Sequence, residues 1–142
     1  MFERILVLID GSEASGRAVN LCMETAASLG SHVYALHVMS PLPTVDLLAD
    51  YIEGNIHFTR LTSRAQALLD DAKRVGEAAG VVVSTEYTFD RRPDTVVVSR
   101  ACARGCDLVV MPSTLAAHPQ GFVRDVAQQV LLDGETPVLV CP

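Results

Sequence analysis

The sequence predicts an α/β fold, a three-layer open sandwich in which a five-stranded parallel sheet has helices on both faces. Two observations favour it: five short apolar runs alternate with segments of helical periodicity, and the runs are almost free of charged residues. Unbroken apolar runs are typical of strands buried on both faces, as in parallel sheets covered by helices. No repeat or linker divides the 142 residues, so we expect a single domain over residues 1–142.

The first strand is expected at residues 5–9, an apolar run that ends at Asp10 and Gly11. A helix should follow, with Ser12 as its N-cap, Leu29 near its end and Gly30 as its stop signal. The apolar residues at helical spacing in this segment are Ala14, Ala18, Leu21, Cys22, Thr25 and Leu29.

The second strand is expected at residues 32–38. Residues 40–57 contain several prolines and predict a surface excursion with one helical turn. A long helix should run over about residues 58–79 and end at Gly80, before a third strand at residues 81–87. The stripe of this helix consists of Leu61, Ala65, Leu68, Leu69, Ala72 and Val75.

The last third of the chain predicts two more helices and two more strands. Pro93 is a favoured first-turn residue and introduces a helix over residues 94–103. The fourth strand is expected at residues 107–111, and a helix over residues 120–132 ends at Gly134. Its inward residues are Val123, Val126, Ala127, Val130 and Leu131, and the fifth strand covers residues 137–141.

Composition and charge argue against several classes of protein. Eleven basic and seventeen acidic residues leave a net charge of −6, which disfavours broad nucleic-acid binding. No apolar run reaches the roughly 18 residues of a membrane span. The first residues also lack the basic start of a secretory signal. We therefore expect a cytoplasmic protein with neither a nucleic acid nor a membrane as its partner.

The cysteines are expected to be small apolar residues of a reduced core rather than metal ligands. They are Cys22, Cys102, Cys106 and Cys141. Cys102 and Cys106 are four residues apart, which places them on one face of a helix. Neither a Cys-x-x-Cys pair nor a His-x-x-x-His pair completes a metal site, and we predict none. His32, His37 and His57 are too dispersed to suggest one.

Four segments have the order and spacing of one known family: residues 5–13 (ILVLIDGSE), 35–38 (ALHV), 107–111 (DLVVM) and 136–140 (TPVLV). Together they resemble the universal stress proteins of the UspA type. The resemblance implies the adenine nucleotide alpha hydrolase-like fold, with strand order 3-2-1-4-5. It also implies a homodimer through the last strand, Pro137 to Cys141. That strand is apolar and has no lysine to deter pairing at a sheet edge.

The resemblance also implies a degenerate ATP-binding loop. ATP-binding members carry Gly-x-x-Gly, nine further residues, and then Gly followed by Ser or Thr. Here Pro112 and Leu115 occupy the positions of the first two glycines, and Arg124 and Asp125 lie near the last pair. Gly121 comes several positions too early. Proline has no N–H to donate and an aspartate repels phosphate, so strong ATP binding is not expected.

The other half of the family's site is partly kept. If ATP or AMP binds, the resemblance implies that it contacts Asp10, Ser12, Val38, Pro112, Ser113 and Arg124. Asp10 would face the ribose and phosphates, and Val38 would line the adenine pocket. The alternatives are that Asp10 accepts hydrogen bonds from its own turn and that Val38 belongs to the core.

No catalytic residue is identified. His118, in the segment that replaces the glycine-rich loop, could titrate near neutral pH, but it has no identifiable nucleophile or orienting partner. A triad of Ser113, His118 and Asp10 is disfavoured because Ser113 lacks the flanking glycines of a nucleophile elbow. Arg91 and Arg92 could reach an anion, although a solvated turn is the favoured interpretation.

Three functions therefore stay open. The preferred one is a non-catalytic stress-response homodimer that acts through contacts with other proteins and does not bind ATP strongly. The second is a sensor that holds ATP or AMP with a degenerate loop. The third is a small-molecule hydrolase on a related fold, which the missing nucleophile disfavours.

Overall fold

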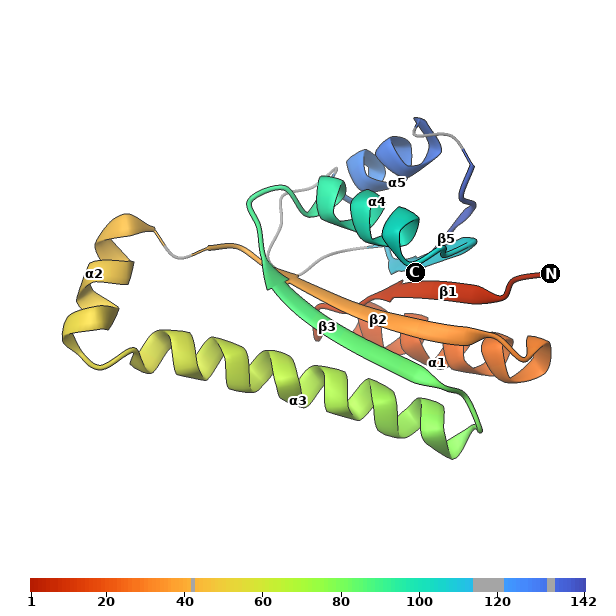
Figure 1. Ribbon diagram of the computed structural model, residues 1–142, viewed down its shortest axis with the longest axis horizontal. Helices are drawn as coiled ribbons and strands as arrows, with labels where there is room; N and C mark the ends of the chain where they lie inside the picture. The colour runs from red at the N-terminus through yellow and green to blue at the C-terminus, as the bar shows by residue number, and fades with distance from the viewer. Residues whose placement is uncertain (42, 114–121, 133–134) are drawn as a thin grey trace.

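The computed structural model contains a five-stranded sheet in the order β3-β2-β1-β4-β5, with all neighbouring strands parallel (Figure 1). It describes residues 1–41, 43–113, 122–132 and 135–142, without the side chains of residues 122–125 and 131. The strands are β1 Arg4–Leu8, β2 His32–Met39, β3 Val83–Phe89, β4 Leu108–Pro112 and β5 Val138–Cys141. The helices are α1 Glu13–Leu29, α2 Thr44–Ile52, α3 Ile56–Ala78, α4 Pro93–Ala103 and α5 Phe122–Leu132. The predicted fold class and strand order are confirmed.

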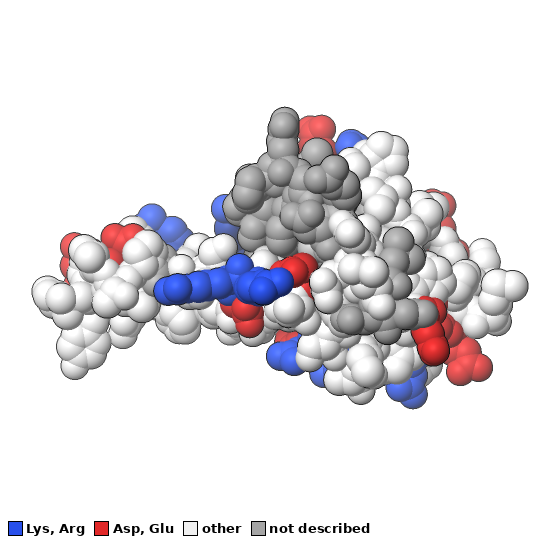
Figure 2. Space-filling view, turned by 90° about the horizontal axis from the view of Figure 1, so that it is seen from above, with Lys and Arg blue, Asp and Glu red and all other residues white. Residues whose placement is uncertain are grey.

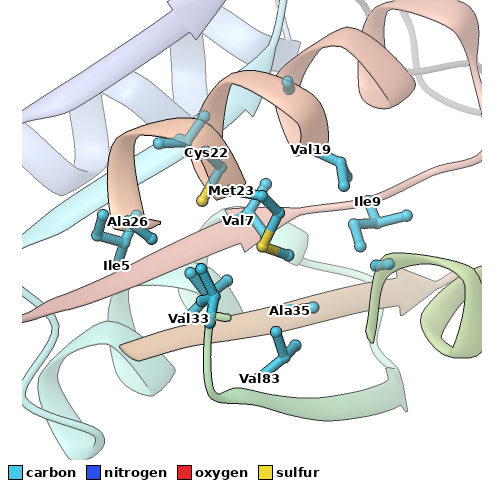
Figure 3. Close-up of a cluster of buried hydrophobic side chains, with 14 of the residues drawn as sticks. Ile5, Val7, Ile9, Val19, Cys22, Met23, Ala26, Val33, Ala35 and Val83 are labelled. Atoms are coloured by element: carbon cyan, nitrogen blue, oxygen red, sulfur yellow. The ribbon is translucent and has the colours of Figure 1, made fainter. Parts of the chain in front are cut away.

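The central strand β1 and its neighbour β4 are buried on both faces. Ile5, Leu6 and Val7 of β1 are 0% exposed. Successive residues alternate between two apolar clusters, one beneath α1 and α3 and the other beneath α4 and α5. Figure 3 shows Ile5 and Val7 converging with Met23 of α1 in the first of these clusters. Burial on both sides is why these strands are continuous apolar runs in the sequence.

Helix α1 begins and ends as predicted, and Ala14, Ala18 and Cys22 of its expected stripe are buried. The Ser12 hydroxyl accepts a hydrogen bond from the Ser15 N–H at 3.1 Å, and Gly30 ends the helix at φ 69°. The prediction was wrong for Leu21 and Leu29, which are exposed. The buried side chains are Ala14, Ser15, Ala18, Val19, Cys22, Met23 and Ala26. Most are small, which lets the helix axis come close to the sheet.

Residues 40–57 contain a full helix, α2, where the sequence predicted one helical turn. Asp50 of α2 caps the next helix: its carboxylate accepts hydrogen bonds from the N–H groups of His57 at 2.7 Å and Phe58 at 3.1 Å. A carboxylate is favourable at a helix N-terminus because it satisfies free donors and complements the dipole. This cap explains why α3 begins at Ile56, before the predicted residue 58. The third strand also begins later than predicted, at Val83.

Helix α3 is 23 residues long and runs along one face of the sheet (Figure 1). Within the described ranges, no helix is long and apolar enough to span a membrane.

A polar network attaches α4 to the β2–β3 side of the sheet. Glu86 of β3 accepts hydrogen bonds from the Tyr34 hydroxyl and from Arg100 Nε, the latter at 2.7 Å. The Arg104 guanidinium lies over the Tyr34 ring, 4.6 Å from its centroid. Burial alone would raise the pKa of Glu86, but the hydrogen bonds from Tyr34 and Arg100 outweigh burial and lower it. Burial and the Glu86 carboxylate together raise the pKa of Tyr34.

Gly76 of α3 is expected to resist substitution. A Cβ at this position would lie 2.3 Å from Val83 Cγ2 and 3.0 Å from Met23 Sδ, so Gly76→Ala should destabilise by about 1–3 kcal/mol through overpacking. Gly16→Ala is the matched control: its Cβ would meet nothing within 4 Å, and it should stabilise by about 0.5–1 kcal/mol. Urea unfolding measures both values, and an equal effect of the two changes would contradict this packing.

The network around Glu86 should make stability depend on pH. Because the folded pKa of Glu86 lies below its unfolded value, its contribution is present above the unfolded pKa and is lost as pH falls through the folded pKa. Glu86→Gln should therefore cost about 1 kcal/mol at pH 7, and the cost should shrink below about pH 4. Urea unfolding at several pH values tests this, with the exposed Glu77→Gln as control. A cost that stays constant down to low pH would refute it.

Candidate functional site

The candidate site lies at the carboxyl edge of the sheet, between β1 and β4. The chain passes from β1 to β2 on one side and enters β4 on the other, so the topology switches direction at this point. Open α/β sheets bind ligands at such switch points. The turn after β1, residues 10–12, and the end of β4 at Pro112 and Ser113 both lie at this edge.

Hydrogen bonds among Asp10, Ser12 and Ser15 hold the β1–α1 turn. Asp10 Oδ1 accepts from Ser12 N–H at 2.9 Å and from the Ser12 hydroxyl at 2.6 Å, and the Ser15 hydroxyl accepts from Asp10 N–H at 3.1 Å. Gly11 makes the turn at φ 84°. The interpretation of Asp10 as an acceptor within its own turn is therefore confirmed. The turn is organised by the chain itself and needs no ligand to form.

The exit of β4 is joined to β5. Pro112 is buried and is the last residue of β4, opposite Cys141, so the predicted strand end at residue 111 is one residue short. The Ser113 N–H donates to the Cys141 carbonyl at 2.6 Å. Pro112 has no N–H, and the N–H of Ser113 is already used. Neither residue therefore presents a backbone donor toward a ligand at this edge.

Val38 lies near the carboxyl end of β2 and is 7% exposed. It belongs to the apolar cluster beneath α4 and α5, with Leu8 and Met111 among its members. The alternative that Val38 is a core residue is confirmed.

Several predicted positions fall outside the described part of the chain. These are Leu115, His118, Gly121 and Gly134, together with the side chains of Val123, Arg124, Asp125 and Leu131. Arg124 is thus placed in α5 by its backbone alone.

His37 also lies at this edge, although the sequence did not predict it as a site residue. Its Nδ1 lies 2.6 Å from the carbonyl oxygen of Ile9, the residue between β1 and the Asp10 turn. A carbonyl only accepts, so Nδ1 carries the proton in this contact. The available signal was its place in the ALHV segment, one residue before Val38 at the end of a strand.

A shallow pocket lies beside the same turn, between α1 and α3. It has a volume of about 230 Å³ and is lined by Gly11, Ser12, Leu68, Asp71 and Val75, among others. Small-molecule sites usually have about 300–1,000 Å³, so this pocket is smaller than a typical one.

The cysteines differ in exposure, and the prediction of a buried Cys102 was wrong. Cys102 is exposed, and Cys106 lies beyond the end of α4, so the two do not share a helix face. Burial raises the pKa of Cys22 to about 12 and of Cys106 to about 11, which suppresses the reactive thiolates. In the described part of the chain, no three His, Cys, Asp or Glu residues are grouped so as to hold a metal ion.

Arg92 belongs to a solvated turn, as favoured from the sequence. Its guanidinium pairs with Asp94 at 3.0 Å and its N–H donates to Asp90 at 2.8 Å. Both Arg91 and Arg92 are exposed.

Comparison with known proteins assigns the fold and the sequence to one family. The chain matches the Universal stress protein family over residues 1–142. A universal stress protein from Methanocaldococcus jannaschii is 29% identical over 143 residues, which cover 99% of this chain and 82% of that protein. The solved structure of hypothetical protein MJ0577 is similar with a TM-score of 0.76, at 22% identity, over 99% of this chain and 96% of that one.

A further solved structure is a universal stress protein in complex with cAMP. It has a TM-score of 0.69 and 22% identity, and the match covers 98% of this chain and 95% of that one. At this identity the likeness shows the shared fold. Because the family match spans the whole sequence, the chain belongs to the universal stress protein family.

Proposed function

We propose that this chain is a non-catalytic, cytoplasmic stress-response protein that acts as a homodimer and does not bind ATP strongly. The observation that carries the proposal is the exit of β4. There Pro112 lacks an N–H, and the Ser113 N–H donates to Cys141.

A phosphate-binding loop depends on backbone N–H groups that point at the anion and on glycines that let the anion approach the backbone. The two residues that leave β4 supply neither. Freeing the Ser113 N–H would break the hydrogen bond that ends the pairing of β4 with β5. Triphosphate binding through this segment would therefore compete with the attachment of the edge strand.

The homodimer proposal rests on β5. This strand forms one edge of the sheet, and Leu139 and Val140 are each 41% exposed although they point to opposite faces. An apolar edge strand without charged residues is a template for pairing with another strand. A second copy of β5 would satisfy the open edge and cover both side chains.

A second candidate function is the binding of an adenine mononucleotide. Two observations favour it: a structurally similar universal stress protein was solved in complex with cAMP, and the Asp10 turn is preorganised at the switch point. A ligand with a single phosphate depends less on the β4 exit than ATP does. In this alternative Asp10 contacts the ribose, and no reaction is catalysed.

Calorimetry with ATP, AMP and cAMP is expected to show no micromolar ATP binding. Pro112→Gly combined with Leu115→Gly should strengthen ATP binding at least about tenfold, about 1.4 kcal/mol, because it restores an N–H and the first two glycine positions of the family loop. Pro43→Gly, at an exposed proline before α2, is the control. Micromolar ATP binding by the unmodified protein would overturn the proposal. AMP or cAMP binding that Asp10→Ala abolishes would establish the second candidate.

Leu139→Lys combined with Val140→Lys should reduce dimerisation through β5, because charges on an edge strand oppose pairing. Light scattering coupled to size-exclusion chromatography measures the mass. Val82→Lys, at a residue that is 59% exposed and lies just before the opposite edge strand, should leave the mass unchanged. An unchanged mass in the double variant would rule out the β5 interface.

A further inference from the structure

Helix α2 exposes its apolar side and buries an acidic residue. Asp50 is 1% exposed and caps α3, whereas neighbouring apolar side chains are 45–78% exposed. We define the α2 face as Val45, Leu47, Leu48, Tyr51 and Ile52 of α2, together with Ile56 and Phe58 of α3.

This arrangement reverses the usual amphipathic pattern. At 100° per residue, Leu48 and Ile52 lie about 160° from Asp50 around the helix, which is nearly the opposite side. A surface helix normally turns such residues toward the core and its carboxylates toward water. Here the carboxylate is needed to cap α3, so the apolar side faces outward. Contiguous apolar patches of this kind mark interaction sites.

The α2 face lies at one end of the molecule. Figure 1 shows α2 and the first turns of α3 extending beyond the sheet, on the side away from β5. In Figure 2 this end, at the left, presents mostly uncharged side chains. Phe58 stacks on Phe89 of β3 with 5.6 Å between ring centroids, which anchors the start of α3 to the sheet.

We propose that the α2 face is a homotypic interface, at which two copies of this chain pack about a two-fold axis. The seven side chains of the α2 face are each 45–78% exposed. Their combined accessible surface is of the same order as the roughly 800 Å² that each partner contributes to a standard interface. An apolar stripe that packs on its own copy needs no second protein of matching shape.

Exposed charges of both signs flank the α2 face. Asp46 and Glu53 are exposed on the α2 side, and Arg60 is exposed on the α3 side. None of the three forms an ion pair with another residue that the structure describes. A two-fold axis can bring the acidic side of one copy to Arg60 of the other. A lipid surface fits less well, because helices that lie on membranes are rich in Lys and Arg and α2 has neither.

This contact and pairing through β5 would use different ends of the molecule. They can therefore form in the same particle, and each can be removed without the other. The α2 proposal does not depend on whether β5 forms an interface.

Sedimentation velocity over a wide concentration range tests the inference. Leu48→Asp combined with Ile52→Asp should halve the mass of the particle, both in the unmodified sequence and in the background of Leu139→Lys with Val140→Lys. Leu21→Asp is the matched control, because Leu21 of α1 is 41% exposed and lies outside the α2 face. This change should leave the mass of the particle unchanged. Circular dichroism checks that the variant is folded, which is expected because both side chains face solvent. A mass unaffected by the α2 substitutions in both backgrounds would overturn the proposal.

Cross-linking supplies a second measurement. Cys102→Ser removes the exposed thiol, and Ile52→Cys then places one thiol on the α2 face. A short bis-maleimide should yield a product of twice the chain mass, and Leu48→Asp should abolish it. Failure to cross-link at concentrations where the protein is associated would count against the interface. Co-sedimentation of a monomeric protein with phosphatidylcholine vesicles would show a lipid partner instead and would also overturn it.

Discussion

Burial of β1 and β4 on both faces is the constraint on which the rest of this structure depends. Ile5, Leu6 and Val7 are completely shielded from water, as are Val109 and Met111 of β4. Two strands without a solvated face require a helical layer on each side, and these layers are supplied by α1 with α3 and by α4 with α5. Polar side chains therefore lie at the edges of the sheet and in the turns at the carboxyl ends of the strands, and not in its middle.

At the carboxyl edge, the hydrogen bond from the Ser113 N–H to the Cys141 carbonyl affects both the sheet and the groups that a ligand could contact. The Ser113 N–H closes the pairing of β4 with β5, and the same N–H is then missing from the surface where a phosphate would lie. In the turn after the neighbouring strand β1, Asp10 Oδ1 accepts from the N–H and the hydroxyl of Ser12, and Asp10 N–H donates to the Ser15 hydroxyl. The first backbone N–H after Pro112, that of Ser113, is therefore used within the sheet. This is the physical basis of the proposal that this member of the family does not bind ATP strongly.

At each end of the molecule, apolar side chains remain exposed because of how the local structure is built. Asp50 is turned inward by the helix terminus that it caps, and the apolar side of α2 is turned outward as a consequence. At the other end, β5 has a neighbour on one side only, so its exposed Leu139 and Val140 follow from its position at the edge. Both surfaces have the exposed apolar side chains that suit contacts between chains.

The five strands, the Ser12 N-cap and the Gly30 stop could be predicted from the sequence, because each depends on residues close together in the chain. The strand order and the place of the site came from resemblance to a family. The inward face of α1, the length of α2, the exposure of Cys102 and the place of His37 beside Ile9 were decided only by the tertiary structure. The physical reason is that a side chain's exposure depends on which neighbour covers it. For α2, that neighbour is the helix terminus capped by Asp50, a contact that forms only when the two helices meet.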